Sequence, residues 1–149
     1  MIFHDKPYIL SAILRIGHAG SDVDNYSKGG YAAVINMDGT LREKAIAHSG
    51  KDGEDVFTDQ TESGKRFAGF RIPSWDKVCE TVKDTALRLP HHKLVGWDFA
   101  IDEGGEVVLI EFNCHIGQNQ GTCGPTFGDM TDEVLREVFK PRMKKQGEG

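Results

Sequence analysis

The sequence predicts an α+β fold in which helices pack on one face of an antiparallel sheet. Three observations indicate this fold class. Two pairs of strand-length apolar runs are each joined by a short turn rich in Gly and acidic residues, which is typical of β-hairpins. Between the pairs lies a segment whose apolar residues recur at helical spacing, and a second helix is expected toward the C-terminal end.

The first half of the chain is expected to be rich in strands. Residues 7–16 form a mostly apolar run that is buried on at least one face. A second run, residues 31–35, leads through an Asp-Gly turn signal into a return strand, residues 41–48. Residues 49–64 are polar and dense in Gly, Asp and Glu, so we expect a mobile loop there.

The clearest helix is predicted between Pro73 and Leu89. Its apolar residues recur every three or four positions with charged residues between them, which indicates one buried face. Ser74 can cap the N-terminus of this helix, and Pro90 ends it. Trp75 is expected to anchor the core.

The second hairpin is predicted over residues 96–113, around an acidic glycine turn. We expect a glycine-rich loop over residues 117–128, which lacks the order of a P-loop, and then a helix over residues 131–140. Residues 141–149 are expected to be a frayed tail. The chain is long enough for one domain with a real core, so residues 1–149 are predicted to form a single domain.

Composition argues against several classes of protein. Eighteen Lys and Arg stand against twenty-three Asp and Glu, with no basic block, so a nucleic-acid partner is not favoured. No apolar stretch approaches the length of a membrane span, and the first residues do not resemble a signal peptide, so we expect a cytoplasmic protein. The three cysteines are best interpreted as reduced thiols, because their spacing with the histidines follows no structural zinc pattern. Cys114 is expected to be a small buried residue rather than a reactive thiol.

Three oxygen-bearing side chains converge on the second hairpin. Counting back from its turn places Asp98 opposite the region of Glu111 and Asn113, which are two residues apart and share one face. Both acids stand between apolar neighbours, where a buried carboxylate is costly unless it is paired or bound to a cation. Two carboxylates and an amide suit a hard cation. The sequence therefore predicts a Mg²⁺ (or Mn²⁺) site.

The hairpin sequence GWDFAIDEGGEVVLIEFN resembles the C-terminal signature of the ATP-grasp superfamily. In that family an Asp on one strand and a Glu-x-Asn on the next hold the Mg²⁺ ions that bridge the ATP phosphates. The thirteen-residue spacing from Asp98 to Glu111 matches this pattern. The resemblance extends to the sugar-transfer-associated branch and covers about residues 9–119, because four motifs occur in the order of that branch: R-I-G at 15–17, D-N-x-x-x-G-G at 24–30, G-x-x-I-P-x-W at 69–75 and V-G-W-D at 95–98.

The resemblance also implies roles for residues outside the hairpin. Arg15 would contact the terminal phosphate or the acyl-phosphate, since a guanidinium can bind phosphate through two parallel hydrogen bonds. The alternative for Arg15 is a surface strand residue, and Lys28 is at least as consistent with a flexible surface lysine. The remaining residues implied at the ATP or acceptor site are Asn25, Lys28, Gly29, Gly30 and Arg71.

The function implied by the resemblance is that of a Mg-ATP-dependent carboxylate ligase. Such an enzyme forms an acyl-phosphate and passes the acyl group to an amine or a similar nucleophile. A whole ATP-grasp unit is considerably longer, and the chain resembles only its C-terminal catalytic half. We therefore expect a truncated or split form, with a second chain or a homodimer supplying the missing subdomain. The alternative is a non-catalytic remnant that binds metal and phosphate or serves as an assembly module.

Overall fold

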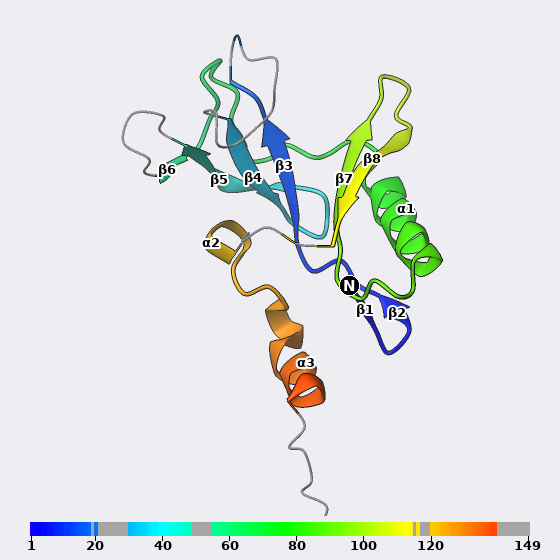
Figure 1. The fold of residues 1–149 in the computed structure, drawn as a ribbon. Helices are drawn as coiled ribbons and strands as arrows, with labels where there is room; N and C mark the ends of the chain where they lie inside the picture. The colour runs from blue at the N-terminus through cyan, green and yellow to red at the C-terminus, as the bar shows by residue number, and fades with distance from the viewer. Residues whose placement is uncertain (19, 21–29, 49–54, 115, 117–119, 140–149) are drawn as a thin grey trace, which may run out of the picture.

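A computed structural model of the chain describes residues 1–18, 20, 30–48, 55–114, 116 and 120–139. The fold is α+β with antiparallel strands, as the sequence predicts (Figure 1). The strands are β1 (Ile2–Phe3), β2 (Lys6–Pro7), β3 (Ala12–Ile16), β4 (Tyr31–Ile35), β5 (Leu41–His48), β6 (Asp55–Thr58), β7 (Gly96–Ile101) and β8 (Val107–Asn113). The helices are α1 (Trp75–Arg88), α2 (Gln120–Cys123), the 3₁₀ turn η2 (Gly128–Met130) and α3 (Thr131–Val138).

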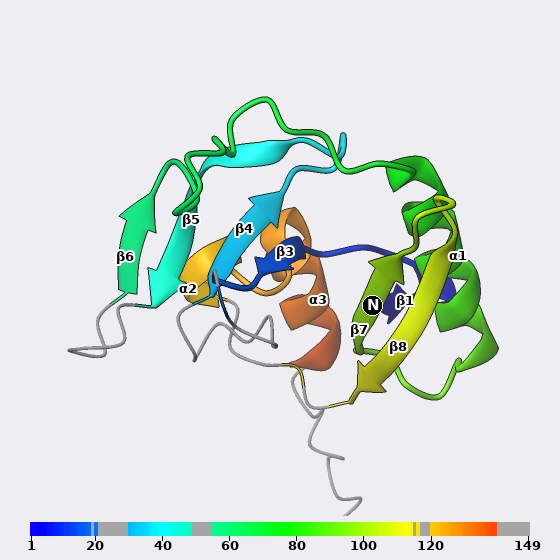
Figure 2. The same cartoon turned by 90° about the horizontal axis from the view of Figure 1, so that it is seen from above.

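The described strands form three sheets rather than one. A four-stranded sheet has the order β3-β4-β5-β6, and two hairpins, β1-β2 and β7-β8, stand apart from it in the hydrogen-bonding pattern. Each strand of the four-stranded sheet pairs antiparallel with the next along the chain. Seen from above, β3 is nevertheless the strand of the four-stranded sheet that lies toward β7, and α1 lies beyond the β7-β8 hairpin (Figure 2).

Two of the predicted boundaries change in the first half of the chain. The strand expected over residues 7–16 begins only at Ala12, because Lys6–Pro7 pair with Ile2–Phe3 in a small separate hairpin. The prediction of a loop throughout residues 49–64 is wrong, since Asp55–Thr58 form β6 and pair with β5. The sequence of β6 is Asp-Val-Phe-Thr, and its last three residue types favour strands when a neighbouring edge is open.

The hydrophobic core lies on one face of the four-stranded sheet. Tyr31, Ala33 and Ile35 alternate along β4 and are all buried on this face. The connection between β6 and α1 crosses the same face and inserts Phe67, which is only 2% exposed. The prediction that Trp75 anchors the core is confirmed: its ring is buried, and its indole N–H donates to the carbonyl of Met37 at 2.9 Å.

The Asp-Gly turn between β4 and β5 is held by a short hydrogen-bond network. Asp38 Oδ1 accepts from the backbone N–H of Thr40 at 3.0 Å and from its hydroxyl at 2.6 Å. These bonds favour the carboxylate and therefore lower the pKa of Asp38. Gly39 has a φ of 87°, a left-handed conformation that glycine adopts without strain.

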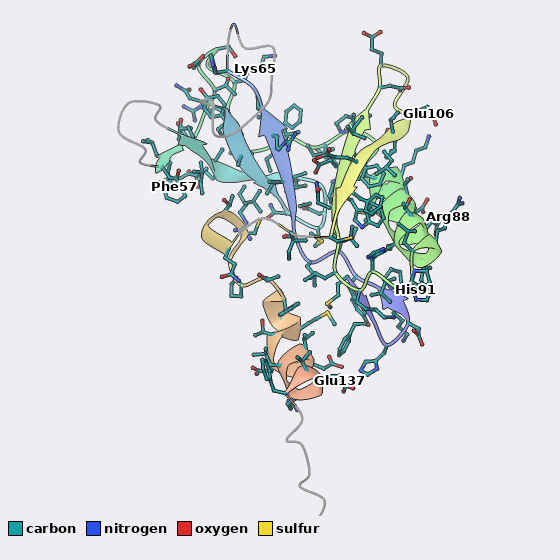
Figure 3. All side chains as sticks on the ribbon, viewed as in Figure 1. Phe57, Lys65, Arg88, His91, Glu106 and Glu137 are labelled. Carbon is teal, nitrogen blue, oxygen red and sulfur yellow. The ribbon has the colours of Figure 1, made fainter. Side chains whose placement is uncertain are left out.

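Helix α1 spans nearly the predicted range, but its N-terminus differs. Ser74 does not cap the helix: its φ is 52°, and its side chain makes no capping hydrogen bond. The left-handed backbone directs the hydroxyl toward the β7-β8 turn instead, where a Cβ added at Gly105 would lie 3.2 Å from Ser74 Oγ. An ion pair of 2.6 Å between Lys77 Nζ and Glu106 Oε1 ties the helix to the start of β8. Figure 3 labels Glu106 at this end of the β7-β8 hairpin.

The C-terminal part begins with short helices. Helix α3 covers residues 131–138 of the predicted 131–140, and Phe139 follows it in a turn. The tail predicted to be frayed, residues 141–149, lies outside the described residues. Every helix in the described parts of the chain is too short or too polar to cross a membrane.

Candidate functional site

The β7-β8 hairpin brings the predicted acidic residues opposite each other. Its register pairs Ile101 with Val107 and Phe99 with Leu109, and then shifts, so that Asp98 pairs with Glu111. The shift is a β-bulge, and without it the regular register would place Ile110 opposite Asp98. A single inserted residue on β8 therefore turns Glu111 to the face that carries Asp98.

Four of the predicted site residues lie together on this face. Asn113 follows two positions after Glu111 on β8, and its Nδ2 donates to Glu111 Oε1 at 3.3 Å. Arg15 on β3 reaches across from the four-stranded sheet, with its Nη1 at 3.6 Å from Asp98 Oδ2. Three strands from distant parts of the sequence thus place a guanidinium, two carboxylates and an amide side by side. We refer to Arg15, Asp98, Glu111 and Asn113 as the acidic site.

The acidic site is open to solvent, and the prediction of buried carboxylates is wrong. The side chains of Arg15 and Asp98 are 42% and 36% exposed, and Glu111 and Asn113 are classed as exposed. The hairpin has only two strands, so β8 is an edge whose apolar Ile110 is itself 63% exposed. An ion pair of this exposure contributes at most about 1 kcal/mol to stability. Folding therefore gains little from these charges.

A protein-family comparison identifies the family of the chain. The model of the family described as sugar-transfer associated ATP-grasp matches residues 1–123. The chain belongs to this ATP-grasp family. No curated protein and no solved structure matched the chain significantly. ATP-grasp proteins generally bind ATP and Mg²⁺ and act on a carboxylate substrate, in ATP-dependent reactions of the ligase type.

The donor set of the acidic site fits the cation that ATP-grasp proteins generally use. Asp98 and Glu111 offer carboxylate oxygens and Asn113 offers an amide oxygen, and hard cations such as Mg²⁺ prefer oxygen ligands. Two carboxylates directly opposite each other on a hairpin repel, and a cation between them would relieve this repulsion. Within the described residues, no group of three or more His, Cys, Asp or Glu side chains is placed to hold a metal, so the amide is needed to complete this set.

The other residues predicted at the ATP-grasp site have different outcomes. Asn25, Lys28 and Gly29 lie outside the described residues. Gly30 is buried directly before β4. Arg71 forms an isolated antiparallel bridge with the residue after the Asp-Gly turn of the first hairpin, and its charge acts on Asp38 there. The structure therefore places Arg71 at that turn.

The structure corrects the prediction for Cys114. This residue is exposed, and its Sγ lies 3.2 Å from His92 Nδ1. β8 ends at Asn113, so the thiol leaves the strand toward the connection between α1 and β7, where His92 is found. The two residues are 22 positions apart, and no local pattern in the sequence signals their contact.

We expect iodoacetamide to modify Cys114 faster than the other two cysteines. Burial raises the pKa of the thiols of Cys79 and Cys123, so both stay protonated at neutral pH, whereas the thiolate is the reactive form. Peptide mapping by mass spectrometry over time measures each rate. Cys114→Ser should remove the fast phase and Cys123→Ser should leave it in place. Equal rates at all three thiols would contradict the exposure of Cys114.

Proposed function

We propose that the chain carries the catalytic half of a Mg-ATP-dependent carboxylate ligase. In this reaction the substrate carboxylate attacks the terminal phosphorus of ATP, ADP leaves, and an acyl-phosphate forms. An amine or a similar nucleophile then attacks the acyl carbon and displaces phosphate. The observation that carries the proposal is the meeting of Arg15 with Asp98 opposite Glu111, on three strands that belong to an ATP-grasp chain.

Each residue of the acidic site has a distinct role in this proposal. Asp98, Glu111 and Asn113 would hold Mg²⁺, which supplies charge neutralisation to the phosphates when it is bound. Arg15 would bind the transferred phosphoryl group and stabilise the charge that develops on it. The Arg15 guanidinium lies beside the Asp98 carboxylate, which supports a site where a cationic side chain and a metal ligand act on the same phosphate.

We further propose that a second chain, or a second copy of this one, covers the nucleotide. Exposed apolar side chains along β8 support this proposal, because exposed apolar surface can mark a contact site. They are Val108 at 43% exposed, Leu109 at 42%, Ile110 at 63% and Phe112 at 44%. The free state of the three cysteines is compatible with a cytoplasmic setting.

Calorimetric titration with ATP tests the function. We expect ATP to bind in Mg²⁺ and to lose most of its affinity when EDTA removes the cation, because the phosphates would then face the carboxylates of Asp98 and Glu111 with no metal ion between them. Binding of equal strength with and without Mg²⁺, or no binding at about 5 mM ATP, would contradict the proposal. Hydroxylamine trapping of the acyl-phosphate as a hydroxamate then separates a ligase from a module that binds Mg-ATP without turnover.

A further inference from the structure

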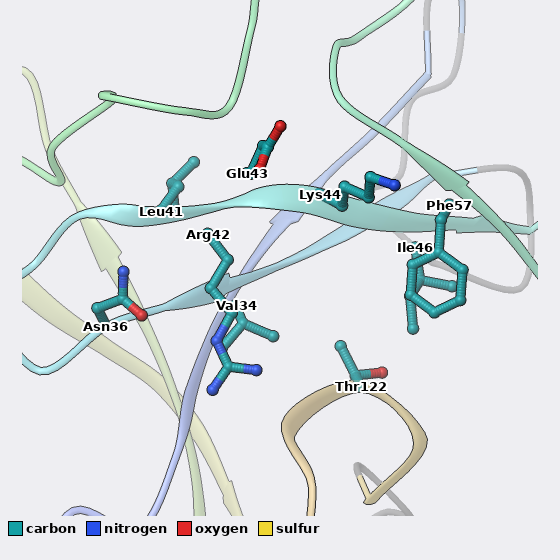
Figure 4. Close-up of a pocket in the computed structure, with 9 residues that line it drawn as sticks. All are labelled: Val34, Asn36, Leu41, Arg42, Glu43, Lys44, Ile46, Phe57 and Thr122. Carbon is teal, nitrogen blue, oxygen red and sulfur yellow. The ribbon is translucent and has the colours of Figure 1, made fainter.

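A pocket lies on the face of the four-stranded sheet that is opposite the core. Its volume is about 550 Å³, and its walls come from β4, β5, β6 and α2. Figure 4 shows the side chains that line it: Val34, Asn36, Leu41, Arg42, Glu43, Lys44, Ile46, Phe57 and Thr122. Neither the sequence motifs nor the acidic site includes any of them. We refer to this cavity as the basic pocket.

The basic pocket combines an apolar floor with two cations. Val34 and Ile46 are buried beneath it, and Phe57 projects from the edge strand β6 at 63% exposure. Arg42 extends from β5 past Val34 toward α2, and Lys44 extends along the strand toward Phe57 (Figure 4). Both cations are exposed, in a chain whose net charge is −5.

Neither of these two cations forms an ion pair with a carboxylate in the described part of the chain. The ion pairs found there use Arg15, Lys77 and Lys93 as their cations, and neither Arg42 nor Lys44. Glu43 also lines the pocket, but its side chain leaves β5 on the side opposite to Arg42 (Figure 4), so one carboxylate stands against two cations. The positive charge of the basic pocket is therefore available to a ligand.

The basic pocket and the acidic site share one face of the sheet. Arg15 pairs with Ala32, Ala32 with Ile46, and Ile46 with Phe57, which makes a continuous row across the four strands. Directly paired residues point to the same face of a sheet. Because neighbouring strands are about 4.8 Å apart, the backbone of Arg15 lies about 10 Å from that of Ile46. A ligand of modest length matches this distance, and the residue between the two, Ala32, is a small side chain that is 6% exposed.

On the basis of the proposed function, we propose that the basic pocket selects a substrate with two anionic ends. The reacting carboxylate lies over Arg15, an apolar body crosses the row to Ile46, and a second anionic group meets Arg42 and Lys44. Guanidinium and ammonium groups bind carboxylate and phosphate through charge-assisted hydrogen bonds, and the apolar floor suits a hydrocarbon or ring body. Arg42 and Lys44 are thus specificity-determining residues for an acid that carries a second carboxylate or a phosphate.

Three probes of matched length test this selectivity without ATP. Azelate carries a carboxylate at each end, its monomethyl ester carries one, and 8-phosphonooctanoate exchanges one carboxylate for a phosphonate. Ligand-observed NMR titration should show azelate binding at least about tenfold tighter than the ester. Tighter binding of the phosphonate than of azelate would assign the second group as a phosphate, and the reverse order would assign it as a carboxylate.

The variants localise the effect. The double variant R42Q/K44Q should bind azelate no better than the ester. The matched double variant K83Q/R88Q, which removes the same two charges from the exposed side of α1, should keep the wild-type preference. Circular dichroism checks that each variant is folded. Equal binding of azelate and its ester by the wild type, no binding of either at about 10 mM, or a preference that survives R42Q/K44Q would overturn the proposal. Mg-ATP affinity is measured in a separate titration. A wild type that does not bind Mg-ATP would overturn the proposed ligase function, whereas the azelate titrations alone decide the selectivity of the basic pocket.

Discussion

Asparagine in place of Asp98 is expected to abolish most of the Mg²⁺ dependence of ATP binding. Asp98→Asn keeps the shape of the side chain and removes one of the two negative charges at the proposed cation site. Mg-ATP affinity should fall at least about tenfold, a change that corresponds to about 1.4 kcal/mol. ATP without Mg²⁺ should bind no worse than to the wild type, because a charge that repels the phosphates is gone. Weaker binding of Mg-ATP together with undiminished binding of metal-free ATP is the combination expected when a metal ligand is removed.

Calorimetric titration with and without EDTA measures both directions. Glu103→Gln is the matched control, since Glu103 is exposed at the turn of the same hairpin and the substitution removes the same charge. If Glu103→Gln weakens Mg-ATP binding as much as Asp98→Asn does, net charge is responsible rather than the acidic site. Unchanged Mg²⁺ dependence in Asp98→Asn would contradict the assignment of Asp98 as a ligand.

The local parts of this site were predictable from the sequence because short-range rules govern them. An acidic glycine turn between two apolar runs predicts a hairpin, and the turn fixes which residues stand opposite each other. Asp98 does pair with Glu111. The bulge at Ile110 that produces this pairing was not predicted, since an extra unpaired residue leaves no mark in the apolar pattern.

The contacts that depend on the whole fold could not be derived from spacing. Arg15 reaches Asp98 only because β3 and β7 come together, and its role was expected from the family resemblance rather than from geometry. The contact of Cys114 with His92 arises in the same way. Exposure was mispredicted at Glu111 because its apolar neighbours indicated a buried strand, whereas an edge strand leaves apolar and acidic residues alike in solvent.

The largest effect on stability is expected from Gly39→Ala, in the turn between β4 and β5. A Cβ at this position would lie 2.7 Å from Trp75 Cδ1 and Cγ, and the φ of 87° is left-handed. The backbone strain costs about 1–2 kcal/mol and the overpacking about 1–3 kcal/mol. Trp75 cannot move aside without cost, because it is 5% exposed and bonded to the carbonyl of Met37.

Gly64→Ala separates the two contributions to this effect. Gly64 has a φ of 77°, but a Cβ there meets no atom within 4 Å, so only the backbone strain applies. Urea unfolding should therefore show that Gly39→Ala lowers the free energy of unfolding more than Gly64→Ala does. In a thermal melt, the melting temperature of Gly39→Ala should lie about 10 °C below that of the wild type. Equal losses in the two variants would mean that the indole does not close over the Asp-Gly turn. This turn sets the register of β4 against β5, and both strands line the basic pocket. As urea is increased, Gly39→Ala should therefore lose its preference for azelate at the urea concentration at which the variant unfolds.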